Sequence, residues 1–313
     1  MDDPSAFSPA PVLGADLGAS AATRRRRKPT QPTRRIEIET PPRHHRSVPP
    51  IDPVSYAPTA EHPVRSKARH LAAHTQVVPH SHPWGQVAFS ISGVIRVTAE
   101  RCTYIVPPSR AVWIPPGVEH LVHVVEDAEL LTLYLHQSET RRGPCAASDP
   151  DSVQWHASRV LEVSSLLREL VTQLNASPGA RVASTREGHL SALALDELRH
   201  AKTVPLGVAL PRDKRLLALC EAVLEDPALW SSLEVCAQRV GASPRTIVRL
   251  FRSELGTTFL QWRQQALLAK ALSMAARKVP LGLIAAELGY ASASAFTAMV
   301  KRSVGAPPSR FFA

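Results

Sequence analysis

Three histidines and a glutamine are the side chains of this sequence best suited to bind a metal or a small ligand. His80 and His82 stand one residue apart, Gln86 follows four residues later, and His120 comes from a separate segment. Alternate residues of a strand share a face, so the first three can point to one side, although Pro83 can disturb that register. Imidazole nitrogens with an amide oxygen predict at most one divalent ion, Zn²⁺, Ni²⁺ or Fe²⁺.

The same side chains also fit a site without metal. Gln86 is neutral and is a weaker ligand than a carboxylate, so it cannot help to balance the charge of a cation. The histidines can instead contact a small effector or be satisfied groups at the mouth of the fold. Aromatic residues nearby can line an apolar effector pocket, although such residues more often belong to a core. The aromatic candidates are Trp84, Phe89, Tyr104, Trp113 and Tyr134.

Short β-rich runs surround these residues between about residue 70 and residue 136, and Gly or Pro turns separate them. This pattern predicts an antiparallel sandwich or small barrel, which we assign to residues 51–145. The spacing of His80, His82, Gln86 and Gly93, with the later segment Pro115-Pro116-Gly117-Val118-Glu119-His120, resembles the two motifs of the cupin family. That resemblance implies a barrel with a metal site, but Gln86 stands where metal-dependent cupin enzymes usually carry a carboxylate.

Residues 146–211 are expected to form a helical linker. Leu167, Leu170 and Leu174 recur at helical spacing, which predicts an amphipathic helix over residues 153–174. A second helix is expected over residues 186–201. The pair can cover the barrel or form a dimer contact, and we favour the dimer because an exposed apolar stripe needs a partner.

Residues 212–313 carry a duplicated pattern. Ala237 is small enough for two helices to cross closely, Gly241 suits a sharp turn, and Ser243 can cap the next helix. Ala285 and Gly289 repeat this pattern 48 residues later, with Ser292 as the new cap. The two copies predict an all-α domain with two helix-turn-helix motifs. The segment between them lacks Gly and Pro and predicts one helix of about 19 residues, about 28 Å long, close to the ~34 Å of one DNA turn.

In each motif, the exposed face of the second helix is the surface that we expect to contact DNA. Arg245 and Arg249 lie four apart on one face, where they can pair with guanine, and Val248 beside them can touch a thymine methyl. Lys301 and Arg302 are expected to contact phosphates. The candidates are Ser243, Arg245, Thr246, Val248, Arg249 and Arg252 in the first motif and Ser292, Ser294, Thr297, Lys301 and Arg302 in the second.

The positive charge of the chain lies at its two ends. Residues 1–50 form a Pro- and Arg-rich segment that we expect to be a disordered basic arm. Residues 51–212 carry fifteen Lys/Arg and fifteen Asp/Glu, whereas residues 213–313 carry thirteen Lys/Arg against seven Asp/Glu. No stretch approaches the ~20 apolar residues of a membrane span, and no secretory signal is evident, so we expect a cytoplasmic protein that meets a polyanion through its C-terminal part.

The duplicated motif, its spacer and the terminal GAPPSRFF resemble the AraC/XylS family of bacterial transcription regulators. The expected fold class is therefore α+β multidomain, with an antiparallel β-barrel followed by the all-α domain. The resemblance implies a non-enzymatic regulator that binds double-stranded operator DNA, senses a small-molecule effector or metal, and forms a homodimer, with RNA polymerase as a candidate partner. The alternatives are a metal-dependent cupin enzyme, either a dioxygenase or an isomerase, and a purely architectural DNA binder. A cupin enzyme would have no need of the duplicated motif, and an architectural DNA binder would not explain the histidines.

Overall fold

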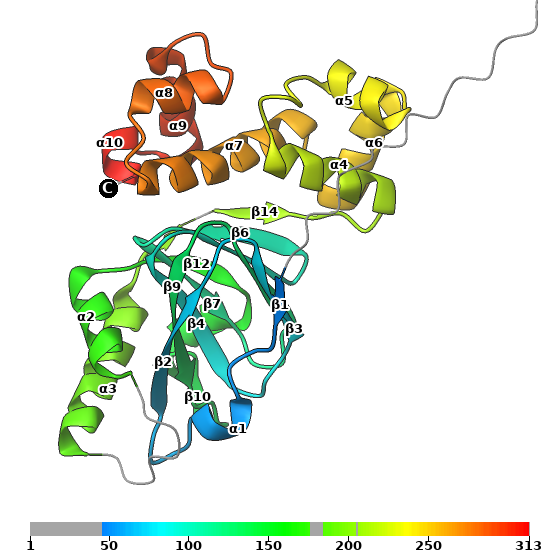
Figure 1. Ribbon diagram of the computed structural model, residues 1–313. Coiled ribbons are helices and arrows are strands. Elements are labelled where there is room, and N and C mark those ends of the chain that lie inside the picture. Colours follow the sequence, from blue (N-terminus) through cyan, green and yellow to red (C-terminus); the bar gives the residue numbers. More distant parts are fainter. Residues whose placement is uncertain (1–45, 176–183, 205, 313) are drawn as a thin grey trace, which may run out of the picture. The chain divides into compact units, whose positions relative to one another are not determined.

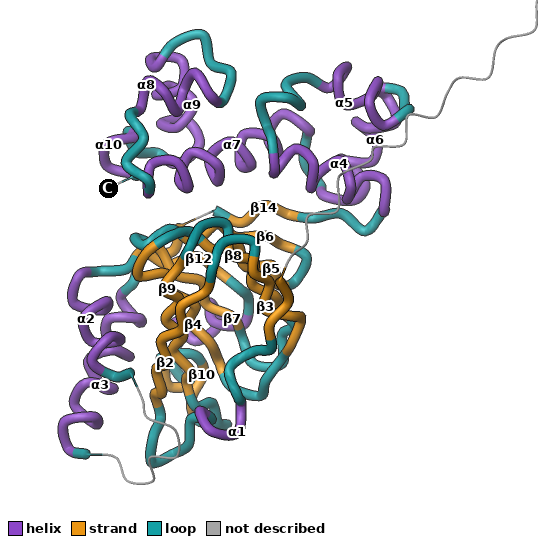
Figure 2. The backbone as a smooth tube through the Cα atoms, viewed as in Figure 1, coloured by secondary structure: helices purple, strands orange, loops and turns teal. Residues whose placement is uncertain are grey.

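The computed structural model describes residues 46–175, 184–204 and 206–312. Strands dominate its N-terminal part and helices its C-terminal part, so the predicted fold class is confirmed (Figures 1 and 2). The expected basic arm lies outside the described residues up to position 45. Within the described ranges, no helix is long and apolar enough to span a membrane.

The N-terminal part contains two six-stranded sheets. The first has the order β1 (Arg46–Val48), β3 (Thr75–His80), β8 (His120–Val124), β5 (Ile95–Ala99), β6 (Cys102–Val106) and β14 (Gly207–Ala209). The second has the order β13 (Thr203–Val204), β12 (Arg159–Glu162), β7 (Arg110–Ile114), β4 (Gly85–Ser92), β9 (Ala128–Leu135) and β2 (Val64–Leu71). Neighbouring strands run antiparallel except for the β1–β3 pair. A separate hairpin joins β10 (Arg141–Arg142) to β11 (Cys145–Ala146).

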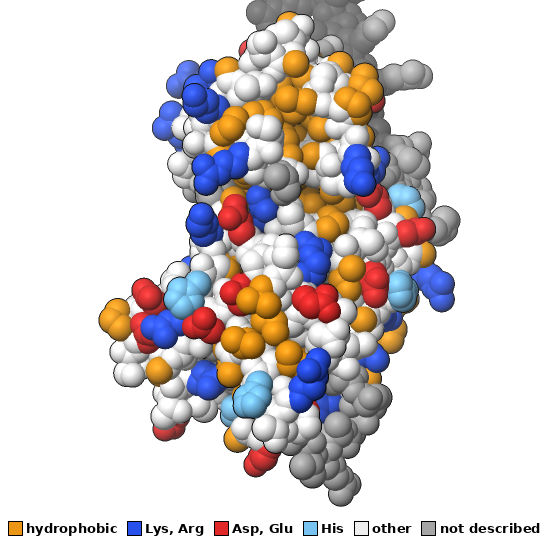
Figure 3. Space-filling view, turned by 90° about the vertical axis from the view of Figure 1, so that its left-hand side faces the viewer, with side chains coloured by type: hydrophobic (Ala, Val, Ile, Leu, Met, Phe, Trp, Pro, Cys, Tyr) orange, Lys and Arg blue, Asp and Glu red, His pale blue; other side chains and the backbone are white. Residues whose placement is uncertain are grey.

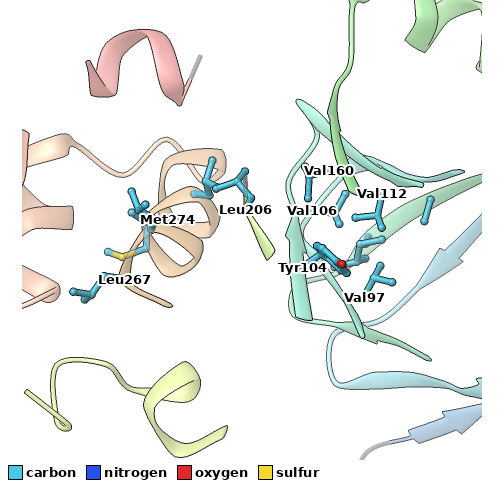
Figure 4. Packing of buried hydrophobic residues seen from close by; sticks show 14 of the residues in the cluster. Val97, Tyr104, Val106, Val112, Val160, Leu206, Leu267 and Met274 are labelled. Atoms are coloured by element: carbon cyan, nitrogen blue, oxygen red, sulfur yellow. The ribbon is translucent and has the colours of Figure 1, made fainter. Parts of the chain in front are cut away.

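Apolar side chains from the two sheets meet in one core. Val97, Tyr104 and Val106 come from the first sheet, and Val112 and Val160 come from the second (Figure 4). Alternate residues of each strand therefore point into this space, as the pleat of a strand requires.

The outer face of the second sheet is also covered. Helices α2 (Ser165–Gln173) and α3 (Thr185–His200) lie side by side there (Figure 1). Leu167, Leu170 and Leu174 are at most 6% exposed, in a core cluster that includes residues of the second sheet and of α3. The leucine stripe that we assigned to a dimer contact is thus buried within the chain. The expectation that this stripe is exposed was wrong, because an amphipathic helix can pack its apolar face on a sheet of its own chain.

The sheets extend beyond the predicted boundaries. β1 lies before residue 51, whereas β12, β13 and β14 lie within the region 146–211 that we expected to be a helical linker. These strands have two to four residues, which is too short to show an alternating pattern in the sequence. The short helices α1 (Pro53–Tyr56) and η1 (Pro150–His156) complete this part.

The C-terminal part contains helices α4 to α10. Their bounds are α4 (Lys214–Glu225), α5 (Leu233–Val240), α6 (Pro244–Leu255), α7 (Phe259–Ala276), α8 (Leu281–Glu287), α9 (Ala293–Val304) and α10 (Pro308–Phe311). The predicted spacer helix is α7, whose 18 residues span about 27 Å. A capping box between Thr258 and Gln261 begins it.

Helices α5–α6 and α8–α9 form the two predicted helix-turn-helix motifs. Gly241 and Gly289 adopt φ values of 63° and 79° at the two turns, a left-handed conformation that glycine reaches without strain. Ala237 and Ala285 are buried in α5 and α8. Phe251 in α6 and Val300, at the corresponding position of α9, are fully buried. Tertiary packing therefore holds each second helix with one face inward and the other free.

Candidate functional site

The three predicted histidines converge at one end of the space between the sheets. His80 at the end of β3 pairs directly with His120 at the start of β8, and their ring centroids lie 4.2 Å apart. His82 follows in the loop and brings its ring centroid to 5.2 Å from that of His120. Gln86 reaches the cluster from β4 in the opposite sheet. One ligating nitrogen from each histidine lies within 4.8 Å of the others.

Backbone carbonyls set the tautomer of all three neutral imidazoles. A carbonyl oxygen only accepts, so each Nδ1 that bonds to one must carry the proton, which leaves Nε2 as a lone-pair donor to a ligand. The three bonds run from His80 Nδ1 to Val78 O at 2.8 Å, from His82 Nδ1 to Trp84 O at 2.9 Å, and from His120 Nδ1 to Val118 O at 2.9 Å. Sequence reasoning missed these acceptors, because a backbone oxygen leaves no signal in residue types.

Burial favours the neutral form of the cluster. It lowers the pKa of His120 to about 3, and it also lowers the pKa values of His80 and His82. Nε2 of His120 is buried and has no hydrogen-bond partner among the described residues. An uncharged imidazole with a free lone pair is the form of histidine that binds metals.

Gln86 poses a specific problem of hydrogen bonding. Its Oε1 lies 2.7 Å from His82 Nε2, and both atoms are acceptors when Nδ1 of His82 carries the only proton. A doubly protonated His82 would resolve the conflict, but burial lowers its pKa. Two solutions remain: the amide presents its nitrogen to His82, or a cation binds both acceptors.

Two of the five aromatic candidates lie beside the histidines. The rings of Trp84 and His82 are stacked with centroids 5.0 Å apart, and the Tyr134 ring lies 5.5 Å from the His82 ring. Burial raises the pKa of Tyr134, so its hydroxyl stays protonated. Tyr104 belongs to the core between the sheets, where its hydroxyl donates to Ser158 O.

Phe89 and Trp113 are corrections to the predicted pocket. Both belong to the core cluster on the outer face of the second sheet, together with residues of α2 and α3. The Trp113 ring contacts Trp155 edge to face, at a centroid distance of 5.4 Å. Gln86 and Phe89 are three apart in β4, so they point to opposite faces of the sheet.

The first helix-turn-helix motif presents a basic stripe. Arg245, Val248, Arg249 and Arg252 are exposed on α6 at positions that share one helix face. The opposite face is buried, as predicted, at Ile247 and Phe251, whereas Leu250 is half-buried.

Two of the first-motif candidates shape the helix end itself. The Ser243 hydroxyl accepts from the Thr246 backbone N–H at 3.1 Å and lies 2.9 Å from the Thr246 hydroxyl. Ser243 therefore caps α6, and Thr246 is half-buried beside it.

The second motif presents shorter side chains, and fewer of them are charged. Ser294 is exposed and Thr297 is half-buried on α9, while Ser292 caps the helix by accepting from Ala295 N–H. Lys301 and Arg302 are exposed in its last turn. Figure 3 shows Lys and Arg side chains gathered along one edge of its upper part, whereas acidic and basic side chains mix over its lower part.

The family models match the two parts of the chain separately. Residues 62–200 match the model of an AraC-like ligand binding domain, and residues 236–313 match that of a helix-turn-helix domain. The first range runs from the loop before β2 to the end of α3, and the second begins within α5 and includes both helix-turn-helix motifs.

The chain is also similar to individual proteins. The HTH-type transcriptional regulator NimR of Escherichia coli is 32% identical over 234 residues, which are 75% of this chain and 81% of that protein. RipA of Corynebacterium glutamicum, also an HTH-type transcriptional regulator, is 32% identical over 102 residues, 33% of this chain and 31% of its own. The crystal structure of ToxT from Vibrio cholerae is 8% identical, covers 80% of this chain and 97% of that chain, and has a TM-score of 0.32.

The match to NimR extends over both parts of the chain, and the change from the strands to the helices of the C-terminal part falls between the ranges of the two family models. The duplicated helix-turn-helix pattern agrees with both findings. The chain therefore belongs to the AraC family of HTH-type transcriptional regulators, with an N-terminal ligand-binding domain and a C-terminal DNA-binding domain.

Proposed function

We propose that the histidine cluster binds one first-row divalent metal and that this binding controls the affinity for DNA. The observation that carries the proposal is the direction of the lone pairs. The three Nδ1 atoms donate to backbone carbonyls, so the three Nε2 atoms are available as ligands. One ring nitrogen of each histidine lies within 4.8 Å of the others. Three imidazoles are a common donor set for Zn²⁺ and related ions.

Gln86 would be the fourth ligand. A cation bound by Gln86 Oε1 and His82 Nε2 would remove the conflict between two acceptors that lie 2.7 Å apart. A metal held there would supply a fixed positive charge near a bound effector. Trp84 and Tyr134, which contact His82, would then form the wall against which that effector packs.

Metal removal tests this proposal with the unmodified chain. We expect elemental analysis to find one equivalent of Zn, Ni or Fe, and we expect its removal by a chelator to change the affinity for DNA fragments that the protein selects from a randomised library. A coupling of this kind is typically worth about 5- to 150-fold. Fluorescence anisotropy with and without added metal would measure it. If none of the tested ions binds the folded protein, the cluster is not a metal site. If the affinity for DNA is the same with and without metal, the metal does not regulate DNA binding.

For DNA recognition, we propose that α6 reads bases and that α9 mainly contacts the backbone. The support is the difference between the two exposed faces, with Arg245 and Arg249 on one and Ser294 and Thr297 on the other. An arginine can donate two hydrogen bonds to guanine, whereas short hydroxyl side chains reach less far into a groove.

We further propose that the protein forms a homodimer through the outer side of α2 and α3. The buried leucine stripe cannot serve, but Leu166 is 50% exposed on α2 and Leu193 is 49% exposed on α3. Figure 3 faces this side, and apolar side chains lie together in its lower part. Exposed leucines on a packed helix pair are suited to a contact with a second copy.

A double substitution that introduces two charges tests the dimer. We expect the wild type to sediment as a dimer at micromolar concentration and the Leu166→Glu, Leu193→Glu double variant to sediment as a monomer, because two buried carboxylates would be costly at the contact. Leu229→Glu, at a leucine that is 47% exposed elsewhere, is the control and should stay dimeric. A monomeric wild type would rule the proposal out.

The protein is proposed to act in the cytoplasm as a binding protein without catalytic turnover. Its relatives of known role are transcription regulators, which supports this assignment. Turnover of any candidate effector by the metal-loaded protein would contradict it.

A further inference from the structure

A cavity of about 280 Å³ lies beside the loop that leads into β8. Pro115, Pro116 and Val118 form its apolar wall. Arg141, Arg142 and His156 also line it. This cavity shares no residue with the three-histidine cluster, and neither the family models nor the relatives assign a role to it.

Packing around the cavity holds its polar side in place. The Gln137 side chain bonds to both backbone groups of Gly143, with its Oε1 accepting at 2.6 Å and its Nε2 donating at 3.3 Å, which closes the β10–β11 hairpin. Gly143 lies against the Trp155 ring so closely that a Cβ atom there would come within 2.6 Å of it. Trp155 is held in turn by Trp113, whose Nε1 donates to Trp155 O at 2.9 Å. The site is thus formed before any ligand arrives, which lowers the cost of binding.

The lining is cationic and lacks a counter-charge. None of the described residues that line the cavity is acidic. Arg141 and Arg142 form no ion pair with the described part of the chain, and Nη1 of Arg141 is buried without a hydrogen-bond partner there. The guanidinium of Arg142 lies 3.1 Å and 3.2 Å from the two ring nitrogens of His156. A buried donor that lacks a partner is costly, and an anion would satisfy it.

We propose that this cavity binds a small organic anion, with a carboxylate against Arg141 and Arg142 and an apolar body against Pro115 and Pro116. Arginine suits this task because its planar fork can donate two parallel hydrogen bonds to a carboxylate. The apolar wall belongs to the loop that also holds the metal-site histidines, since Val118 O accepts from His120 Nδ1 and Gly117 N–H donates to His82 O. A ligand in the cavity therefore contacts the segment that orients two of the three imidazoles.

Titration calorimetry with benzoate and its neutral counterpart benzamide tests the proposal on the full chain. We expect saturable binding of benzoate at millimolar concentrations and none of benzamide. Arg141→Gln and Arg142→Gln should each weaken benzoate binding about tenfold or more, since each removes a charge-assisted hydrogen bond. Arg186→Gln removes an exposed arginine of α3 and should leave benzoate binding unchanged.

The His120→Ala variant separates this cavity from the histidine cluster. Benzoate binding should persist in it, because His120 does not line the cavity. Loss of binding in that variant would place benzoate at the cluster and overturn the proposal. Equal binding of benzamide, wild-type affinity in both arginine variants, or no benzoate binding would also overturn it.

Discussion

Replacing His120 with alanine is expected to lower the affinity for the metal at least about 100-fold. His120 contributes the most buried imidazole of the cluster, at 1% exposure, and its Nε2 has no other partner among the described residues. Loss of a residue that only orients a ligand typically costs 10- to 100-fold in metal affinity, so removal of the ligand itself should cost more. Equilibrium titration with Zn²⁺ against a competing chelator would measure this change.

Two further variants make the result specific to the site. Gln86→Glu should bind the metal more tightly than the wild type, because a carboxylate helps to balance the charge of the ion. His70→Ala removes a histidine that is 82% exposed in the side chain and should bind metal as the wild type does. The metal-free His120→Ala protein should keep the DNA affinity of the metal-free wild type. Equal metal affinity in a folded His120→Ala variant would refute the assignment.

Alanine at Arg245 or Arg249 is expected to relax base preference within one part of the operator by about 5- to 150-fold. The magnitude follows from the 1 to 3 kcal/mol of discrimination that a bidentate contact to guanine typically supplies. Both side chains are exposed on the free face of α6, while Phe251 on the other face anchors the helix. Binding profiles over randomised DNA would show the lost preference as a flat stretch at the affected positions.

Lys301→Ala is the matched comparison in the second motif. A phosphate contact carries no sequence information, so this change should weaken binding to all DNA sequences alike. It should also reduce the slope of log binding constant against log salt concentration by about one. The assignment of base reading to α6 fails if neither arginine variant alters the base preference.

The helix-turn-helix motifs could be predicted because their signals are local. Ser243 and Ser292 cap helices through backbone groups three residues away. Gly241 and Gly289 supply the one backbone conformation that most residues avoid. The apolar positions of α6 fall at helical spacing, so the sequence predicts which face packs and which face is free.

The convergence of the histidines was also predictable, although its geometry was not. The motif predicted that His80, His82 and Gln86 share one face of a strand and that His120 joins them from a second hairpin. Instead, β3, the following loop and β4 supply the first three side chains, and the register of β3 with β8 brings His80 and His120 together. The hydrogen bonds that fix the tautomers depend on backbone oxygens, whose positions follow from the loops and not from residue types.

The errors in the sheet part share one physical cause. The second sheet is covered on both faces, so β4 and β7 are buried almost throughout and their polar positions do not mark a solvent-exposed face. Trp113 could therefore not be assigned to the inner or the outer face from the sequence, whereas the odd spacing between Gln86 and Phe89 was a signal that they point to opposite faces. For the same reason the partner of the leucine stripe on α2, the outer face of its own sheet, was not evident.

The sequence by itself determined the two-part plan, the duplicated DNA-binding motif and the residue types of the histidine cluster, because each of these depends on contacts between near neighbours or on a recurrent motif. Only the tertiary structure decided which aromatic residues face the histidines, where the short strands β12 to β14 add to the sheets, and that Arg141, Arg142 and His156 share a cavity with Pro115 and Pro116. These features join segments far apart in the chain, and their energy comes from packing and burial that no single segment encodes.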